Sequence, residues 1–163
     1  MVNRTAWTGG NLFSGIAFNP AFNAADLNSL PNGSSVLSSV TPFANGTSLD
    51  QFMDISVELT CASSAIAAGA NLGVWLATLQ VDGTTLGDGT LTAGTQAAVT
   101  PVWTPIAAIP LFASTRTTLI GSVTGILIPP RTFAHILQNN AGPALAASGN
   151  ACSISTYNQN LNN

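Results

Sequence analysis

The chain has 163 residues, of which 46% are hydrophobic and only 6% are charged, and its formal net charge is −3. Ordinary soluble domains carry about 25% charged residues. So apolar a composition excludes intrinsic disorder, and the complete lack of lysine argues against nucleic-acid binding, which depends on basic residues neutralising phosphates. The length suffices for one domain with its own core.

Asn, Ser, Thr and Gly take the place of the missing charges. A surface with so little charge promotes association, so we expect partner proteins to cover much of it. A neutral secreted domain is the alternative. The N-terminus lacks the continuous apolar segment of a secretory signal, and no run of about 18 apolar residues predicts a membrane span.

Residues 1–33 differ from the rest and are predicted to form an extended N-terminal arm. The arm carries aromatic side chains that we expect to act as partner-binding anchors, since aromatic residues dominate binding when they fill pockets. The anchors are Trp7, Phe13, Phe18 and Phe22. The alternative is that the arm folds back onto its own domain. Residues 24–30 could form one turn of helix.

Strand patterns dominate from residue 34 onward. The strongest covers residues 51–61, where apolar residues from Met53 to Cys61 alternate with polar ones, and this period of two predicts a core face and an outer face. A shorter strand is predicted at 34–40. Residues 71–81 are apolar on both faces, which is typical of a strand covered on both sides.

The second half continues the pattern. Residues 81–101 are predicted to form a long Gly- and Thr-rich loop that contains at most one short strand. Residues 106–112 are predicted to form an edge strand, because their prolines cannot donate to a ladder. The remaining expected elements are a long strand at 117–128 bent at Gly121 or Gly125, strands at 131–138 and 150–157, and a polar tail at 158–163.

Seven or eight short strands separated by turn residues predict an all-β fold, an antiparallel sandwich or barrel. Several long connections favour a jelly roll or Greek key over a meander. The domain prediction is therefore an arm at 1–33 and a jelly-roll β-sandwich at 34–163.

Residues suited to catalysis are few. His135 is the one histidine and is expected to be packed or to face a partner. Cys61 and Cys152 lie within apolar patterns and are interpreted as buried free thiols, although a disulfide between them stays open. No zinc-ligand spacing exists. We therefore expect no catalytic residue, no metal and no cofactor, and interpret the chain as not an enzyme.

Two acidic pairs are candidate sites. Asp54 and Glu58 share a strand face, but their Cα atoms would lie roughly 13 Å apart, too far for a glycosidase pair. They are expected to be solvated or paired with Arg116 or Arg131. A second acidic pair, Asp82 and Asp88, lies in a Gly-rich loop and is explained by turn formation better than by calcium binding.

Several motifs occur in a suggestive order. Residues 49–60 read LDQFMDISVELT, followed by GVWLA at 73–77 and VDG at 81–83; later come LIPPRTF at 127–133, LQNNAGPAL at 137–145 and ASGN at 147–150. Over roughly residues 49–157 this order resembles the small jelly-roll capsid decoration (cement) proteins of tailed bacteriophages. The near absence of charge and the long aromatic arm depart from that family.

The resemblance implies a non-enzymatic virion structural protein on the outer capsid surface, made in the cytoplasm of the host bacterium, that cements neighbouring capsomers. Its implied partners are the major capsid protein and further copies of itself, a homotrimer being favoured over a dimer, with no nucleic acid and no membrane. One alternative is a carbohydrate-binding jelly-roll module of a tail fibre or receptor-binding tip, with Trp75 or Trp103 stacking on a sugar. Another is a shell subunit, which the lack of lysine disfavours.

Overall fold

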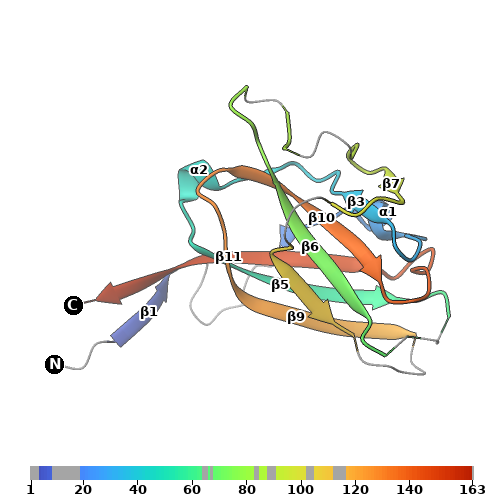
Figure 1. Ribbon diagram of the computed structural model, residues 1–163. Helices are drawn as coiled ribbons and strands as arrows, with labels where there is room; N and C mark the ends of the chain where they lie inside the picture. The colour runs from blue at the N-terminus through green and yellow to red at the C-terminus, as the bar shows by residue number, and fades with distance from the viewer. Residues whose placement is uncertain are drawn as a thin grey trace.

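Two antiparallel sheets face each other in the computed structural model, which describes residues 4–8, 19–63, 66, 68–82, 85–87, 91–101, 105–111 and 117–162 (Figure 1). The first sheet has the strand order β1-β11-β5-β9, with β2 also pairing with β11. The second has the order β7-β3-β10-β6-β8, with β4 also pairing with β10. The prediction of an all-β antiparallel sandwich is confirmed.

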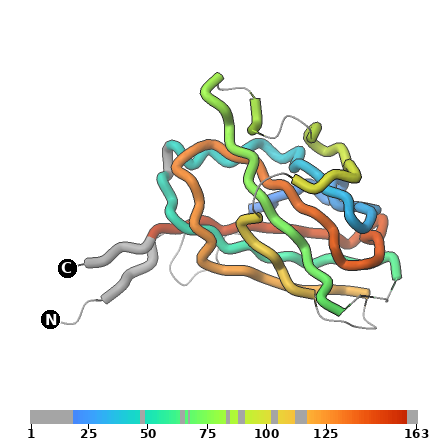
Figure 2. Tube along the Cα trace, in the orientation of Figure 1, coloured from blue at the N-terminus to red at the C-terminus, as the bar shows by residue number. Residues whose placement is uncertain are grey.

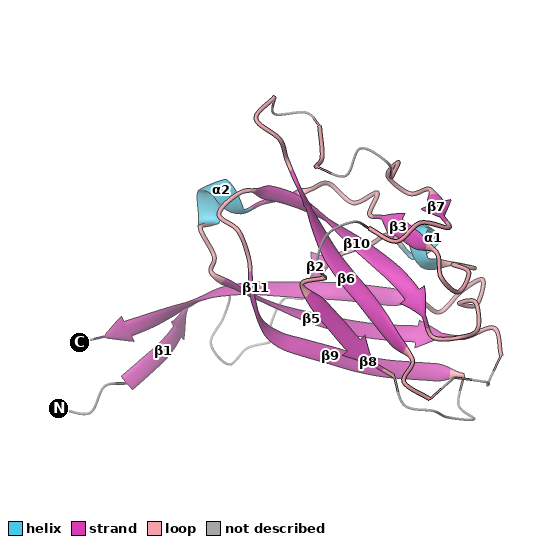
Figure 3. Cartoon of the chain, in the orientation of Figure 1, coloured by secondary structure: helices cyan, strands magenta, loops and turns pink. Residues whose placement is uncertain are grey.

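The strands of the first sheet are β1 (Arg4–Thr8), β2 (Asn19–Pro20), β5 (Phe52–Thr60), β9 (Thr118–Leu127) and β11 (Ala151–Asn162). Those of the second sheet are β3 (Ser35–Leu37), β4 (Phe43–Ala44), β6 (Asn71–Thr78), β7 (Gln96–Ala97), β8 (Ala107–Pro110) and β10 (Thr132–Asn140). Figure 3 shows how little helix accompanies them; two single turns are described, α1 (Ala24–Leu27) and α2 (Asn45–Ser48).

The core lies between the two sheets and follows the predicted alternation. On β5, Met53, Ile55, Val57 and Leu59 are each at most 1% exposed, while Glu58 is exposed. Burying each such side chain contributes about 1.5–3 kcal/mol of hydrophobic free energy. The period-two pattern of this segment therefore sets which face of the first sheet points inward.

The central strands of the second sheet, β6 and β10, are buried on both faces, as the apolar pattern of residues 71–81 predicted. On its outer face, Trp75 and Ile136 belong to a separate apolar cluster that also includes Leu91. The chain supplies this cover itself, because Leu91 and the partly buried Leu86 and Ala97 pack against the cluster. They come from the segment that leads into and includes β7, which lies beside β3 (Figure 2). The large indole of Trp75 is only 4% exposed as a result.

The bend predicted in β9 falls at Gly125. Its φ of 71° is left-handed, a region that glycine enters without steric cost, and the register between β5 and β9 shifts beside it, between Met53 and Ile55. Gly121 has a different role. A Cβ atom there would lie 2.8 Å from Cγ2 of Ile109, so the glycine permits β8 to pack closely.

The boundary predicted at residue 33 does not match the packing. Residues 19–33 belong to the sandwich: Asn19 of β2 pairs with Ile154 of β11, and Leu27 and Leu30 are fully buried. For this stretch, the alternative that the arm folds back onto its own domain holds, because its apolar side chains complete the core. Residues 1–3 and 9–18 lie outside the described part of the chain.

The predicted polar tail also differs from the structure. Strand β11 continues to Asn162, and its last residues pair with β1, from Arg4 opposite Asn162 to Thr8 opposite Asn158. In Figure 1 this two-stranded ribbon leaves the sandwich at one end. Polar residues can form a strand here because a partner strand satisfies their backbone hydrogen bonds.

Candidate binding pocket and exposed sheet face

The four predicted anchors have different outcomes. Phe22 is 3% exposed and packs in the core, with its ring centroid 6.2 Å from that of His135, so it is not an anchor for a partner. Its burial in the sandwich is the physical reason for this correction. For Trp7 the structure describes only the backbone, as part of β1. Phe13 and Phe18 lie outside the described residues.

The two cysteines are buried and free, as predicted. Burial raises the pKa of the Cys152 thiol to about 12 and also raises the pKa of Cys61. Both thiols are therefore protonated at neutral pH and are poor nucleophiles. Within the described ranges, no three His, Cys, Asp or Glu side chains gather into a metal-binding group.

Asp54 has a structural function at the bulge in β9. One of its carboxylate oxygens, Oδ1, accepts hydrogen bonds from the Gly125 N–H at 2.8 Å and from the Tyr157 hydroxyl at 2.9 Å. Burial, together with the hydrogen bond to Asp54 and its negative charge, raises the pKa of Tyr157 to about 12. The carboxylate thus connects β5 to both of its neighbouring strands.

The other acidic candidates show no site. Asp82 Oδ1 accepts a hydrogen bond from the Thr85 N–H at 2.9 Å, as expected for turn formation. Asp88 and Arg116 lie outside the described residues, and Arg131 is exposed.

A pocket opens where the edge of β10 lacks a continuous partner strand. Strand β3 pairs with residues 136–138 of β10, and β4 pairs with residues 132–133. The intervening segment, residues 38–42, leaves the sheet beside His135. It keeps a backbone hydrogen bond to β10, in which the Ser38 N–H donates to the His135 carbonyl at 2.9 Å. Pro42 lacks the N–H that continued pairing would require.

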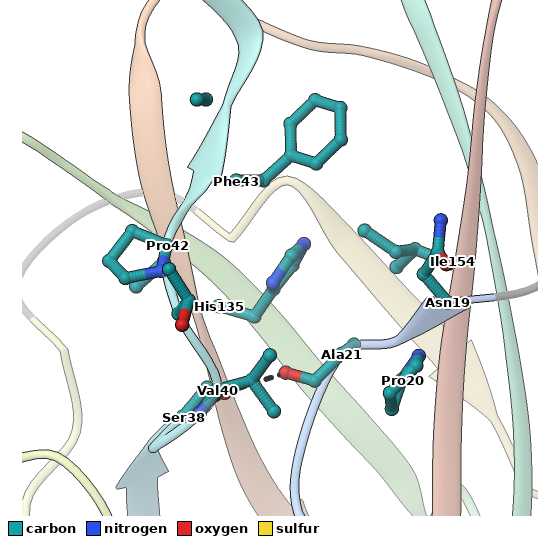
Figure 4. Close-up of a pocket in the computed structure, with 12 residues that line it drawn as sticks. Asn19, Pro20, Ala21, Ser38, Val40, Pro42, Phe43, His135 and Ile154 are labelled. Carbon is teal, nitrogen blue, oxygen red and sulfur yellow. Dashed lines mark hydrogen bonds between the residues drawn. The ribbon is translucent and has the colours of Figure 1, made fainter.

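The pocket has a volume of about 280 Å³ and lies between the sheets. Figure 4 shows the imidazole of His135 between two walls: one from residues 38–43, the other from β2, Ala21 and Ile154. Apolar side chains dominate both walls. The lining residues are Asn19, Pro20, Ala21, Ser38, Val40, Thr41, Pro42, Phe43, Ala44, Ala134, His135 and Ile154.

His135 is the unusual member of this lining. It is 5% exposed, and its Nε2 atom has no hydrogen-bond partner among the described residues. The ring packs edge-on against Phe133, with centroids 5.4 Å apart. Burial lowers the pKa of His135 to about 4, so the imidazole is neutral at physiological pH.

Sequence reasoning placed His135 on an alternating strand beside Phe133 but missed the pocket. The alternation that buries Phe133 and Leu137 could have indicated that His135 faces the core with them. No sequence signal reports the gap between β3 and β4, because it depends on strands far apart in the chain.

The outer face of the first sheet differs from that of the second, because the outward side chains of β5, β9 and the described part of β11 are exposed or half-buried. A row of three serines crosses its middle: Ser153, Ser56 and Ser122. A second row, at one end, is apolar. It consists of Tyr157, Phe52 and Leu127, and the first two rings stack with centroids 5.8 Å apart.

Ile120, opposite Glu58 on the same face, is 78% exposed, and Leu127 is 73% exposed. The structure therefore presents large apolar side chains on a sheet whose inner face forms the core. The burial of Trp75 removes one of the two tryptophans considered for stacking on a sugar, and Trp103 lies outside the described residues.

Neither described helix approaches the length and apolar character that crossing a membrane would require. Comparison of the chain with protein-family models, with curated proteins and with solved structures found no match.

Proposed function

We propose that this chain is a non-enzymatic virion structural protein: a capsid decoration subunit that binds the outer surface of a tailed-bacteriophage shell and cements neighbouring capsomers. Its partners in this proposal are the major capsid protein and further copies of itself, with a trimer favoured over a dimer. The motif order over residues 49–157 led to this hypothesis, and the strand connectivity and the exposed sheet face support it.

The connectivity supports a jelly roll. Strands β2, β3, β5 and β6 alternate between the two sheets, and β8, β9, β10 and β11 do the same, while β6 and β8 are neighbours in one sheet. Eight strands with this alternation are what two interlocking Greek keys produce, and capsid proteins are among those that use them. We therefore infer that the sandwich is a jelly roll.

The exposed face of β11, β5 and β9 is the observation that carries the proposal. The second sheet covers its outer face with the chain's own residues, whereas the first sheet presents Ile120, Leu127 and a row of serines. Apolar side chains on a face that is poor in charge are typical of surfaces buried in an assembly.

The test measures binding to expanded shells assembled from a major capsid protein encoded in the same genome as this chain. The wild-type protein is expected to co-sediment with such shells and to saturate them. The double variant Ile120→Asp/Leu127→Asp should bind at least about ten-fold more weakly, because burying two apolar side chains contributes several kcal/mol and the new carboxylates would be desolvated.

Val81→Asp is the matched control, since Val81 is 98% exposed but lies after β6, away from the exposed face. All variants should keep the wild-type melting temperature, because the substituted positions are exposed. Failure of the wild-type protein to bind the shells would contradict the proposed function. Equal binding by the double variant and Val81→Asp would contradict the use of this face.

A further inference from the structure

We propose that the outer edge of β9 pairs with the β9 of a second copy of this chain, so that the first sheets of two copies join into one continuous sheet. Strand β9 ends the first sheet, and no strand in the described part of the chain pairs with its outer side (Figure 1). The pairing does not depend on the proposed function, whereas its consequence for a capsid rests on that function.

The other terminal strands of the two sheets offer little edge to a partner. Strand β1 has five residues, β7 has two, and β8 has four and ends at Pro110. Strand β9 has ten residues, with neither proline nor a charged side chain among them. Proteins usually protect a long edge with lysine, proline or a covering segment, because its unpaired N–H and C=O groups readily accept another strand. The composition of β9 therefore indicates an edge that is meant to be paired.

The regular part of this edge lies before the bulge. Residues 118–123 of β9 pair in order with residues 60–55 of β5, and the register shifts only beyond Ile55. At about 3.3 Å per residue, this part presents an edge of roughly 20 Å. Alternate residues of an antiparallel strand direct their N–H and C=O groups to the same side, so about half of these residues offer both groups to a partner.

A second copy of β9 suits this edge for two reasons. Because β9 carries no charged side chain, two copies meet without like-charge repulsion across the ladder. Ile120, which is 78% exposed, lies near the middle of the regular part, so antiparallel pairing about a two-fold axis brings it beside its own copy and covers both side chains. Two-fold contacts of this self-complementary kind are the commonest in homo-oligomers.

The pairing also sets the direction of the exposed sheet faces. Residues that lie opposite each other in antiparallel strands have their side chains on the same face, so the exposed faces of both copies point the same way. On a capsid, such a dimer presents two binding faces to neighbouring capsomers, and their simultaneous binding strengthens attachment by about a hundred-fold or more. Of the two oligomeric states given above, this contact builds the dimer.

Sedimentation equilibrium of the isolated protein measures the pairing without any shell, and we expect the wild-type protein to be a dimer. Thr118→Lys/Ser122→Lys adds two charges at exposed positions of the edge and should dimerise at least about ten-fold more weakly, because like charges then meet across the ladder. Ala151→Lys/Ser155→Lys is the matched control. It adds the same charges at the same spacing to the outward side of β11, away from the edge, and should dimerise like the wild-type protein.

Charge reversal identifies the strand that occupies the edge. Thr118→Glu/Ser122→Glu should also dimerise weakly by itself, but an equal mixture of the glutamate and lysine variants should regain dimers, because opposite charges then face each other. All variants should keep the wild-type melting temperature, since the substituted side chains are exposed or half-buried on the outer face.

The proposal is overturned if the wild-type protein is a monomer or a trimer, or if the lysine variant dimerises as tightly as the control. It is also overturned if the mixture of lysine and glutamate variants stays monomeric, since a strand other than β9 would then occupy the edge. The shell-binding experiment is independent of these results. A dimer that does not bind shells contradicts only the proposed function, and a monomer that binds shells contradicts only the pairing.

Discussion

The buried histidine predicts a specific acid sensitivity of folding. His135 is 5% exposed, and burial lowers its pKa from an ordinary 6.5 to about 4. In the unfolded chain it protonates near pH 6.5, so between pH 6.5 and 4 the unfolded state binds more protons than the folded state. Stability therefore falls as the pH falls through this window and is fully retained above it.

The size of the effect follows from the shift. Each unit of pKa difference corresponds to about 1.4 kcal/mol, so protonation should remove about 2.5 kcal/mol of the free energy of unfolding between pH 8 and pH 4.5. Aspartate and glutamate side chains also begin to titrate near the lower pH. Their contribution must be removed by comparison with a variant that lacks only the imidazole.

His135→Phe is that variant, because an apolar ring of similar shape suits a position packed against Phe22 and Phe133. Urea unfolding of both proteins at pH 8 and pH 4.5 gives four free energies. The loss on acidification should be about 2.5 kcal/mol larger for the wild-type protein. Equal losses in the two proteins would refute the assignment of a buried neutral imidazole.

Three further predictions follow from single sites. Asp26→Ala should lower the free energy of unfolding by about 3 kcal/mol in urea titrations, since the 3% exposed carboxylate accepts three hydrogen bonds whose donors would lose their partner. Gly125→Ala should lower the free energy of unfolding by about 1 kcal/mol, because alanine is strained at a φ of 71°. Gly46→Ala is the control: a Cβ atom there also meets no atom within 4 Å, and the substitution should leave the free energy of unfolding unchanged or raise it. Equal effects of the two substitutions would contradict the role of φ. Cys61 and Cys152 should both resist a thiol reagent in the native protein and react in urea, and rapid native labelling would contradict their burial.

The parts of the fold that sequence predicted are those with a local signal. Strand β5 was evident because its inward and outward residues differ in polarity at every step from Met53 to Leu59. The cover over the second sheet was evident because β6 is apolar on both faces: Trp75 lies on the face opposite that of Leu72 and Val74. These patterns arise within one strand and need no knowledge of its neighbours.

The parts that sequence missed depend on distant partners. Strands β2 and β4 have two residues each and exist because β11 and β10 offer an edge. Sequence alone predicted Phe22 to be an exposed anchor, but the pairing of β2 with β11 places it in the core. The pocket likewise forms from segments near residues 20, 40, 135 and 154, and no short-range pattern connects them.

The position of β11 has a consequence for how the protein is made. The last strand of the sequence lies in the middle of the first sheet, where it joins β5 to β1 and β2. Until it is synthesised, β5 has an open edge and the two N-terminal strands have no partner. Folding of the first sheet must therefore wait until β11 has been synthesised, and a chain that ends before β11 exposes the unpaired edges that drive aggregation.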